Sequence, residues 1–128
     1  LESLIKTSEK DTILFQVTHL DHRRPDQERL ASAKFINQLI GDRDNVPAIL
    51  AGDFNAVPGS RTLKEFGKLW MRTNPEVIPT VPVTKPMRQI DYILVRPKDR
   101  WKLVNAQVLD EPLASDHRAI FAVIELNE

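Results

Sequence analysis

The chain has 128 residues, 41% of them hydrophobic and 28% charged, a composition typical of one small folded domain or part of a larger one. Its 18 Lys and Arg balance 18 Asp and Glu, so the zero net charge does not indicate a strongly basic nucleic-acid-binding protein, although nucleic acid stays possible as a partner. Cysteine is absent, which excludes disulfides and thiolate metal sites, and no apolar run approaches the roughly 20 residues that span a bilayer.

The first strong element is a strand over residues 12–18 (TILFQVT), which is rich in β-branched and aromatic residues. A Ser-Glu-Lys-Asp turn over residues 8–11 precedes it, and residues 1–6 are predicted to be its hairpin partner. The chain begins at Leu1 without a Met or a signal-peptide pattern, so we expect a piece of a longer protein.

A helix and a second strand follow. Pro25 and Asp26 open a helical pattern that Gly41 is expected to cap, and residues 47–52 (PAILAG) form a short apolar strand. The apolar positions of the helix are Leu30, Ala33, Phe35, Ile36, Leu39 and Ile40. A strand, a helix and an apolar strand indicate a βαβ crossover whose strands are covered on both faces.

The second half of the chain alternates a loop with strands. Ser60 is expected to cap a short helix that ends near Phe66, and four prolines between residues 71 and 89 predict a long ordered loop that helps to select a substrate. Three further strands are predicted over residues 90–95, 104–109 and 119–126. Trp70 and Trp101 are expected to pack in the core rather than to stack on a ligand. The fold class is therefore α/β, with one mixed sheet of about five or six strands.

A carboxylate and an amide follow the strand over residues 47–52. Asp53 and Asn55 are two residues apart, so their side chains point the same way in extended chain. Such a pair suits hydrolysis of a phosphate ester, because the carboxylate can orient water and the amide can donate to a phosphate oxygen. The alternative is an Asx turn that ends the strand.

An acid and an imidazole mark two later strands. Asp91 interrupts the otherwise apolar strand 90–95, and a buried carboxylate must be paired. His117 is its natural partner, since an imidazole that acts as a base needs a carboxylate to fix its tautomer. The neighbouring Asp116 is free for a metal or a phosphate. The alternatives are a solvent-facing Asp91 on an edge strand and a solvated turn over residues 115–117.

Two further histidines, His19 and His22, flank Asp21 at the end of the first strong strand. They leave open a zinc site, although their spacing matches no helical zinc motif and a third ligand is not evident.

Together, the ordered segments THLDH, LAGDFN, IDYIL and SDHRAI resemble the C-terminal half of the endonuclease/exonuclease/phosphatase (DNase I-like) superfamily. The segment Pro79-Thr80-Val81-Pro82 is similar to a Thr-aromatic-Pro segment of that family, with Val81 in place of the aromatic residue. The resemblance covers about residues 12–126. It implies half of a four-layer α/β sandwich, with one mixed sheet that carries helices on one face.

The resemblance also implies a chemistry: in-line attack of water on a phosphodiester or phosphomonoester, assisted by Mg²⁺ or Mn²⁺. By this resemblance His117 is the general base or phosphate-stabilising residue, and Asp91 is its orienting carboxylate. Asp53 would activate the water and Asn55 would contact the phosphate. Two more roles follow, His19 as a second histidine at the phosphate and Asp116 as the metal carboxylate.

The resemblance further implies that residues 1–128 are the C-terminal portion of such a domain. The family's Asn and its principal metal-ligand Glu belong to the N-terminal half and match nothing here, so we expect this portion alone to be inactive or very weakly active. A lone half would expose an apolar sheet face, which predicts a homodimer through that face. The alternative is a non-catalytic half-domain that serves as an interaction or assembly module. The substrate and the compartment are not indicated by the sequence.

Overall fold

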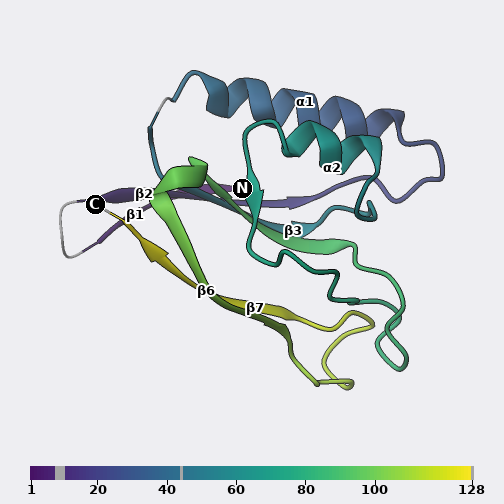
Figure 1. Ribbon diagram of the computed structural model, residues 1–128. Helices are drawn as coiled ribbons and strands as arrows, with labels where there is room; N and C mark the ends of the chain where they lie inside the picture. Colours follow the sequence, from purple (N-terminus) through teal and green to yellow (C-terminus); the bar gives the residue numbers. More distant parts are fainter. Residues whose placement is uncertain (8–10, 44, 128) are drawn as a thin grey trace.

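The computed structural model describes residues 1–7, 11–43 and 45–127, so most of the turn predicted over residues 8–11 lies outside the described part of the chain. Figure 1 shows two helices above a five-stranded sheet and a separate two-stranded ladder below it. The α/β class predicted from the sequence is confirmed.

The five-stranded sheet is mixed and has the strand order β1-β2-β3-β5-β4. β2 runs parallel to β3, whereas the pairs β1–β2, β3–β5 and β4–β5 are antiparallel. The strands are β1 (Glu2–Lys6), β2 (Thr12–His19), β3 (Ala48–Asp53), β4 (Met71–Arg72) and β5 (Asp91–Arg96). The predicted hairpin of the first two strands is confirmed, and the two-residue β4 lies within a segment that was predicted to be loop only.

Both helices lie on the same face of this sheet (Figure 1). α1 (Gln27–Gly41) connects the parallel strands β2 and β3, which confirms the βαβ crossover, and it runs through Gly41 instead of being capped there. α2 (Arg61–Phe66) begins after Ser60, whose Oγ accepts a hydrogen bond from the Leu63 amide at 3.3 Å as the sequence predicted. Within the described residues, neither helix is long and apolar enough to cross a membrane.

The hydrophobic core lies between the sheet and the helices. Leu14, Leu50 and Leu94 from three neighbouring strands are almost fully buried there beneath Ala33 and Ile40 of α1. The opposite face is less well covered, because Ile5 and Val17 point to that side and remain 46% and 42% exposed. The expectation that the strands are covered on both faces is therefore wrong at this edge of the sheet.

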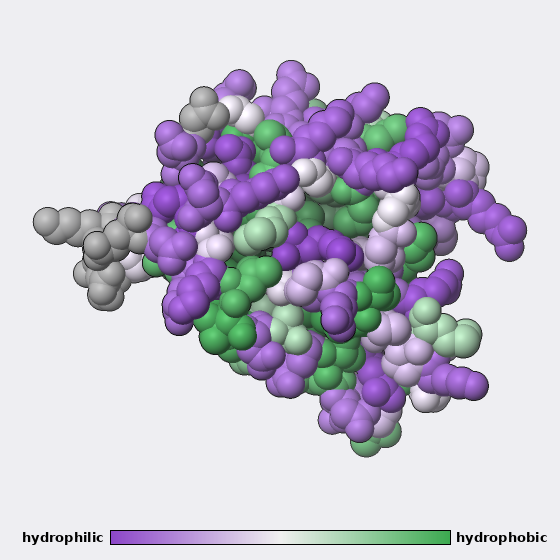
Figure 2. Space-filling model, viewed as in Figure 1, coloured by the Kyte–Doolittle hydropathy of each residue, from purple (hydrophilic) through white to green (hydrophobic). Residues whose placement is uncertain are grey.

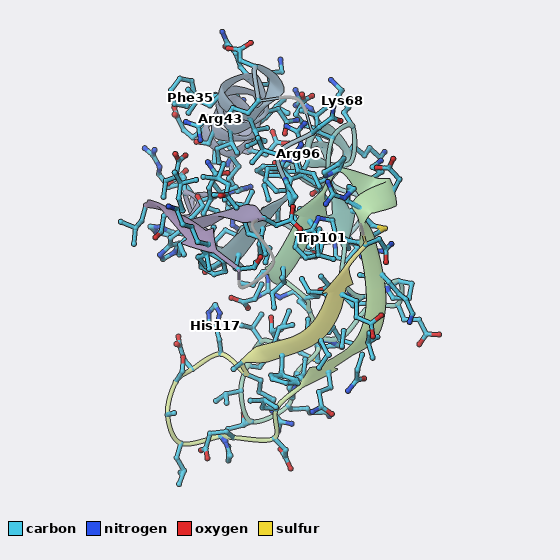
Figure 3. The ribbon with its side chains drawn as sticks, turned by 90° about the vertical axis from the view of Figure 1, so that its left-hand side faces the viewer. Phe35, Arg43, Lys68, Arg96, Trp101 and His117 are labelled. Carbon is cyan, nitrogen blue, oxygen red and sulfur yellow. The ribbon has the colours of Figure 1, made fainter. Side chains whose placement is uncertain are left out.

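The last two strands form a ladder of their own. β6 (Trp101–Val108) pairs only with β7 (Ile120–Leu126) in the described part of the chain, so the prediction of one continuous sheet is wrong for these strands. The 3₁₀ turn η1 (Lys98–Arg100) redirects the chain between β5 and β6. Trp101 fixes this corner, since it is buried and its Nε1 donates to the Arg96 carbonyl at 2.7 Å (Figure 3). Alternation of apolar and polar residues along a strand predicts which side chains are buried, but it does not predict which strand is the hydrogen-bonded partner.

Candidate active site

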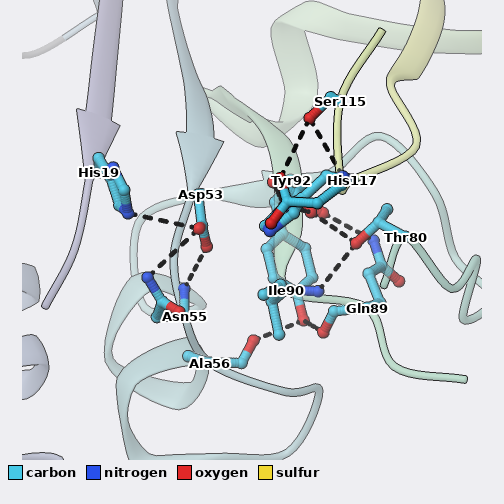
Figure 4. Close-up of polar contacts among 12 residues, drawn as sticks. His19, Asp53, Asn55, Ala56, Thr80, Gln89, Ile90, Tyr92, Ser115 and His117 are labelled. Atoms are coloured by element: carbon cyan, nitrogen blue, oxygen red, sulfur yellow. Dashed lines mark hydrogen bonds and ion pairs between the residues drawn. The ribbon is translucent and has the colours of Figure 1, made fainter. Parts of the chain in front are cut away.

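The register of three neighbouring strands brings three polar side chains to one edge of the sheet. His19 at the end of β2 pairs with Asp53 at the end of β3, which in turn pairs with Asp91 at the start of β5. Paired residues of adjacent strands point to the same face. These side chains therefore share the face opposite the helices. Figure 4 shows His19 and Asp53 of this group together with His117.

Asp53 is held in place by its own turn. Oδ1 of its carboxylate accepts a hydrogen bond from the backbone N–H of Asn55 at 2.7 Å. Oδ2 lies 3.3 Å from the side-chain nitrogen Nδ2 of the same residue. Asn55 has a left-handed φ of 46°, and its Nδ2 also donates to the Leu20 carbonyl at 2.9 Å. This is the Asx turn that the sequence left open, and it coexists with the clustered carboxylate. Both protons of the Asn55 side-chain amide are used, one by Asp53 and one by the Leu20 carbonyl, so Asn55 orients Asp53.

Gly52 and Phe54 set the position of Asp53 from either side. Gly52 has a φ of 147°, and a Cβ there would lie 1.8 Å from the Thr18 carbonyl oxygen, so only glycine lets β2 and β3 approach this closely. Phe54 is fully buried on the helix side, with edge-on contacts to Phe66 and Tyr92 at ring distances of 5.0 and 5.3 Å. The tip of β3 is therefore rigidly packed beneath the carboxylate.

The expected contact between Asp91 and His117 is present. Nδ1 of His117 lies 3.0 Å from Asp91 Oδ2 and 3.1 Å from Oδ1, and both side chains are largely buried. Partial burial lowers the pKa of His117, but the hydrogen bond and charge of Asp91, helped by Asp53 and Asp116, outweigh burial and raise it above the usual 6.5. The contact assigns the proton on Nδ1 to the bond with Asp91 and leaves Nε2 as the free ring nitrogen.

Thr80 completes the support of Asp91. Its fully buried hydroxyl donates to Asp91 Oδ2 at 2.5 Å and accepts from the Ile90 amide at 3.3 Å. The carboxylate is thus held both by the Thr80 hydroxyl and by the imidazole of His117.

The loop between β4 and β5 connects Asp91 to the segment around His117. The Arg118 amide donates to the Thr80 carbonyl at 2.9 Å, and the Val83 amide donates to the Asp116 carbonyl at 3.0 Å. Arg118 Nε also donates to the Val83 carbonyl at 2.8 Å. The loop that the sequence assigned to substrate selection therefore fixes the segment that carries His117.

A pair of buried amides braces the same loop. Asn74 Nδ2 donates to Gln89 Oε1 at 3.1 Å, and Gln89 Nε2 lies 3.3 Å from Asn74 Oδ1 and 3.2 Å from the Asp91 carbonyl. Gln89 Oε1 also accepts from the Ile78 amide at 3.1 Å. Sequence reasoning missed the roles of Thr80 and Gln89. The available signals were a Thr between two prolines and a Gln directly before an apolar strand, and neither identifies its distant partner.

The remaining predicted residues are more exposed. His19 is mostly exposed, with Nε2 3.4 Å from Asp53 Oδ2. His22 and Asp116 are exposed as well. In the described part of the chain, the group whose ligand atoms lie within 4.8 Å of one another consists of Asp53, Asp91 and His117. This group includes neither of the histidines behind the zinc alternative, and it does not include Asp116.

A cavity of about 330 Å³ opens beside these residues, between the two sheets. Its polar wall contains Asp53, Asp91 and His117, and its apolar wall contains Ile93 and Ile120. Two carboxylates with an imidazole supply a base and hard oxygen donors, a set that suits hydrolysis with an oxygen-preferring divalent cation.

The sequence matches the profile of the endonuclease/exonuclease/phosphatase family over residues 4–117. Comparison with curated proteins gave no match. Several solved structures share the fold at low sequence identity. Mannosyl-6-phosphatase from Bacteroides thetaiotaomicron has a TM-score of 0.73 at 21% identity, covering 91% of this chain and 52% of that one.

Two eukaryotic structures are similar to the same extent. The human Nocturnin catalytic domain with bound sulfate has a TM-score of 0.77 at 20% identity, covering 98% of this chain and 52% of that one. TDP2 from D. rerio, complexed with a single-stranded DNA product, has a TM-score of 0.76 at 17% identity, covering 97% of this chain and 60% of that one. The chain thus spans about half the length of the structures that it matches.

Proposed function

The chain belongs to the endonuclease/exonuclease/phosphatase family, and we propose that it is the C-terminal portion of a metal-dependent phosphoesterase that uses water to cleave a phosphodiester or phosphomonoester. The observation that carries this proposal is the grouping of Asp53, Asp91 and His117 within 4.8 Å at the mouth of a cavity. Proteins of similar fold include mannosyl-6-phosphatase and TDP2 complexed with a single-stranded DNA product.

The proposed roles follow from the contacts. His117 is the base or the residue that stabilises the phosphate, because Nδ1 contacts Asp91 while Nε2 has no hydrogen-bond partner among the described residues. Asp91 orients the ring, and Thr80 in turn holds Asp91. Asp53 orients or deprotonates the attacking water.

The residues around the phosphate have less direct support. His19 lies beside Asp53 and is exposed enough to reach a phosphate or a leaving group. Asn55 contacts the phosphate only if its amide releases one of its two present acceptors, Leu20 and Asp53.

The donor set fits Mg²⁺ or Mn²⁺. Asp116 is the carboxylate that the family resemblance assigns to the metal, and it is close enough to raise the pKa of His117. Asp53 offers a second hard oxygen ligand, whereas both oxygens of Asp91 already contact His117. When bound, the cation would neutralise charge that develops on the phosphate. Mg²⁺ prefers six oxygen ligands, so the carboxylates of this chain leave positions for water, for the substrate and for a further protein ligand. We propose that the parent protein supplies that further ligand, the Glu of the N-terminal half.

The test compares two forms of the protein with generic phosphodiester and phosphomonoester substrates in Mg²⁺ or Mn²⁺. We expect the 128-residue chain to be inactive or very weakly active, and the chain joined to the preceding segment of its parent to be active. In the joined form, His117→Gln should lower kcat about 10²- to 10⁴-fold, whereas Lys68→Ala on the far side should not change it. A joined protein that binds both metals and hydrolyses none of the substrates would contradict the proposal.

A second candidate function is a non-catalytic half-domain that assembles with another protein or with its own copy. The exposed apolar side chains of Ile5 and Val17 favour it, because monomers rarely leave a sheet face open. The same observation supports a homodimer through that face. A metal titration followed by the assay above separates this candidate from the enzyme.

A further inference from the structure

A second cavity lies on the opposite face of the sheet from Asp53 and Asp91. It has a volume of about 370 Å³ and is formed by α2, the loop before it, β4, β5 and η1. Leu94 at its floor belongs to the helix-facing side of β5, and no residue of this pocket lines the cavity beside His117. A ligand bound here would therefore not compete for the candidate active site.

Three cationic side chains line the pocket, and they come from three different elements. Lys64 belongs to α2, Arg72 to β4 and Lys98 to η1, and the lining contains no acidic residue. None of the three forms an ion pair with another residue in the described ranges. Lys98 Nζ donates to the Gly67 carbonyl at 2.8 Å and Arg72 Nη2 to the Pro75 carbonyl at 3.0 Å, so neutral carbonyls alone fix them. Like charges around one hollow repel one another unless an anion balances them.

The floor of the pocket is apolar. Phe66, Trp70 and Leu94 are almost completely buried beneath it, and Leu63 and Pro58 add further apolar surface. The indole nitrogen of Trp70 already donates to Asn37 Oδ1 at 3.0 Å, so Trp70 offers a ligand only its ring. A cationic rim over an apolar floor fits a molecule with an anionic head and an apolar body.

We propose that this pocket binds a small organic anion, with a phosphate-like or carboxylate head at Lys64, Arg72 and Lys98 and an apolar body against Pro58 and Leu63, above the buried ring of Trp70. The volume suits a body of about the size of one aromatic ring with its substituents. This binding does not depend on the proposed hydrolysis, because the two sites share no residue.

Binding to the pocket is tested with phenylphosphonate, because a phosphoesterase does not hydrolyse its C–P bond. EDTA is present so that no divalent cation holds the probe at the candidate active site. Proton–nitrogen spectra follow the indole signals of Trp70 and Trp101, which a Trp101→Phe variant assigns. We expect a saturable shift of the Trp70 signal with Kd of about 1 mM, and a smaller effect from inorganic phosphate or benzyl alcohol, each of which carries half of the chemistry. Equal effects from all three probes, or no shift of Trp70, would overturn the proposal.

Charge-removing variants test the rim. Lys64→Met and Lys98→Met should each weaken binding about three- to fivefold, and the matched control Lys68→Met, at an exposed lysine outside the pocket lining, should leave Kd unchanged. Figure 3 shows Lys68 at the far end of the molecule from His117. His117→Gln should also leave Kd unchanged, and a loss of binding there would place the ligand in the other cavity and overturn the proposal. Circular dichroism checks that each variant is folded.

Discussion

At the scale of single residues, Asp91 determines what His117 can do. Burial alone would lower the pKa of His117, yet the hydrogen bond to Asp91 and the nearby carboxylates raise it. A histidine that acts as a base must be neutral. In the proposed enzyme, activity should therefore rise with pH through a midpoint above 6.5 and be lost as His117 becomes protonated.

Removal of the Asp91 charge should reverse this shift. In Asp91→Asn the negative charge that raises the pKa of His117 is gone, and the amide oxygen can form only a neutral hydrogen bond, while the burial that lowers the pKa remains, so the pKa should fall. Proton NMR of the imidazole C–H signals measures it without any assay of activity, in EDTA, with His19→Gln and His22→Gln variants for assignment. Asp110→Asn is the matched control, because Asp110 contacts Arg118 and is largely exposed. An unchanged midpoint in Asp91→Asn would show that the pair does not form in solution.

Gly52 is the residue whose replacement the fold tolerates least. In Gly52→Ala the new Cβ meets the Thr18 carbonyl at 1.8 Å, so β2 and β3 must separate at the point where they present His19 and Asp53. We expect the free energy of unfolding to fall by about 3 kcal/mol or more, measured by urea denaturation.

Gly59→Ala is the control for this change. Gly59 also has a positive φ, 82°, but a Cβ there meets nothing within 4 Å, so only backbone strain of about 1 kcal/mol is expected. Equal losses in the two variants would mean that strain, and not the close approach of the strands, makes Gly52 necessary.

At the scale of elements, the loop between β4 and β5 depends on a buried amide pair. Gln89→Leu would leave Asn74 and the Ile78 amide without their partner in a buried place. Unsatisfied buried polar groups cost about 1–3 kcal/mol each, so we expect a loss of about 2–4 kcal/mol in the free energy of unfolding. Lys85→Ala, an exposed change in the same loop, should cost less than about 0.5 kcal/mol. If the two variants lose equal stability in urea, the amide pair does not hold the loop.

The elements with strong local patterns were predictable from the sequence. β2, α1, β3 and β5 follow from apolar runs and periodicity, and Ser60 follows from the chemistry of helix caps. The contact between Asp91 and His117 was predictable as well, because an acid in an apolar strand needs a partner.

Other features depend on contacts between residues that are far apart in the sequence, so no local sequence pattern predicts them. The separate ladder of β6 and β7 is one example, since two alternating strands fit either sheet. The support of Asp91 by Thr80 is another, because it requires a loop of irregular backbone to return to β5. The occupied amide of Asn55 also depends on Leu20, which is distant in sequence.

At the scale of the whole molecule, the two faces of the five-stranded sheet differ. The helix face is closed over a packed core, whereas the other face has apolar side chains that β6 and β7 cover only in part. Figure 2 shows apolar surface beside and along this ladder, mixed with hydrophilic residues. The candidate site opens between the same two sheets. Whatever covers the open face therefore lies next to the groups proposed to be catalytic.

For this chain alone, the open face predicts self-association. A symmetric dimer through β1 and β2 would bury Ile5 and Val17 of both copies, and apolar burial contributes about 25 cal/mol per Å². Light scattering coupled to size-exclusion chromatography should give twice the monomer mass of 14.7 kDa at high concentration.

The double change Ile5→Glu and Val17→Glu should return the protein to monomer, since two charges per copy would have to be desolvated. Phe35→Glu, an exposed apolar position on α1, should leave the dimer intact. A monomer at all concentrations, or a dimer that only Phe35→Glu dissociates, would show that the sheet face is not the contact.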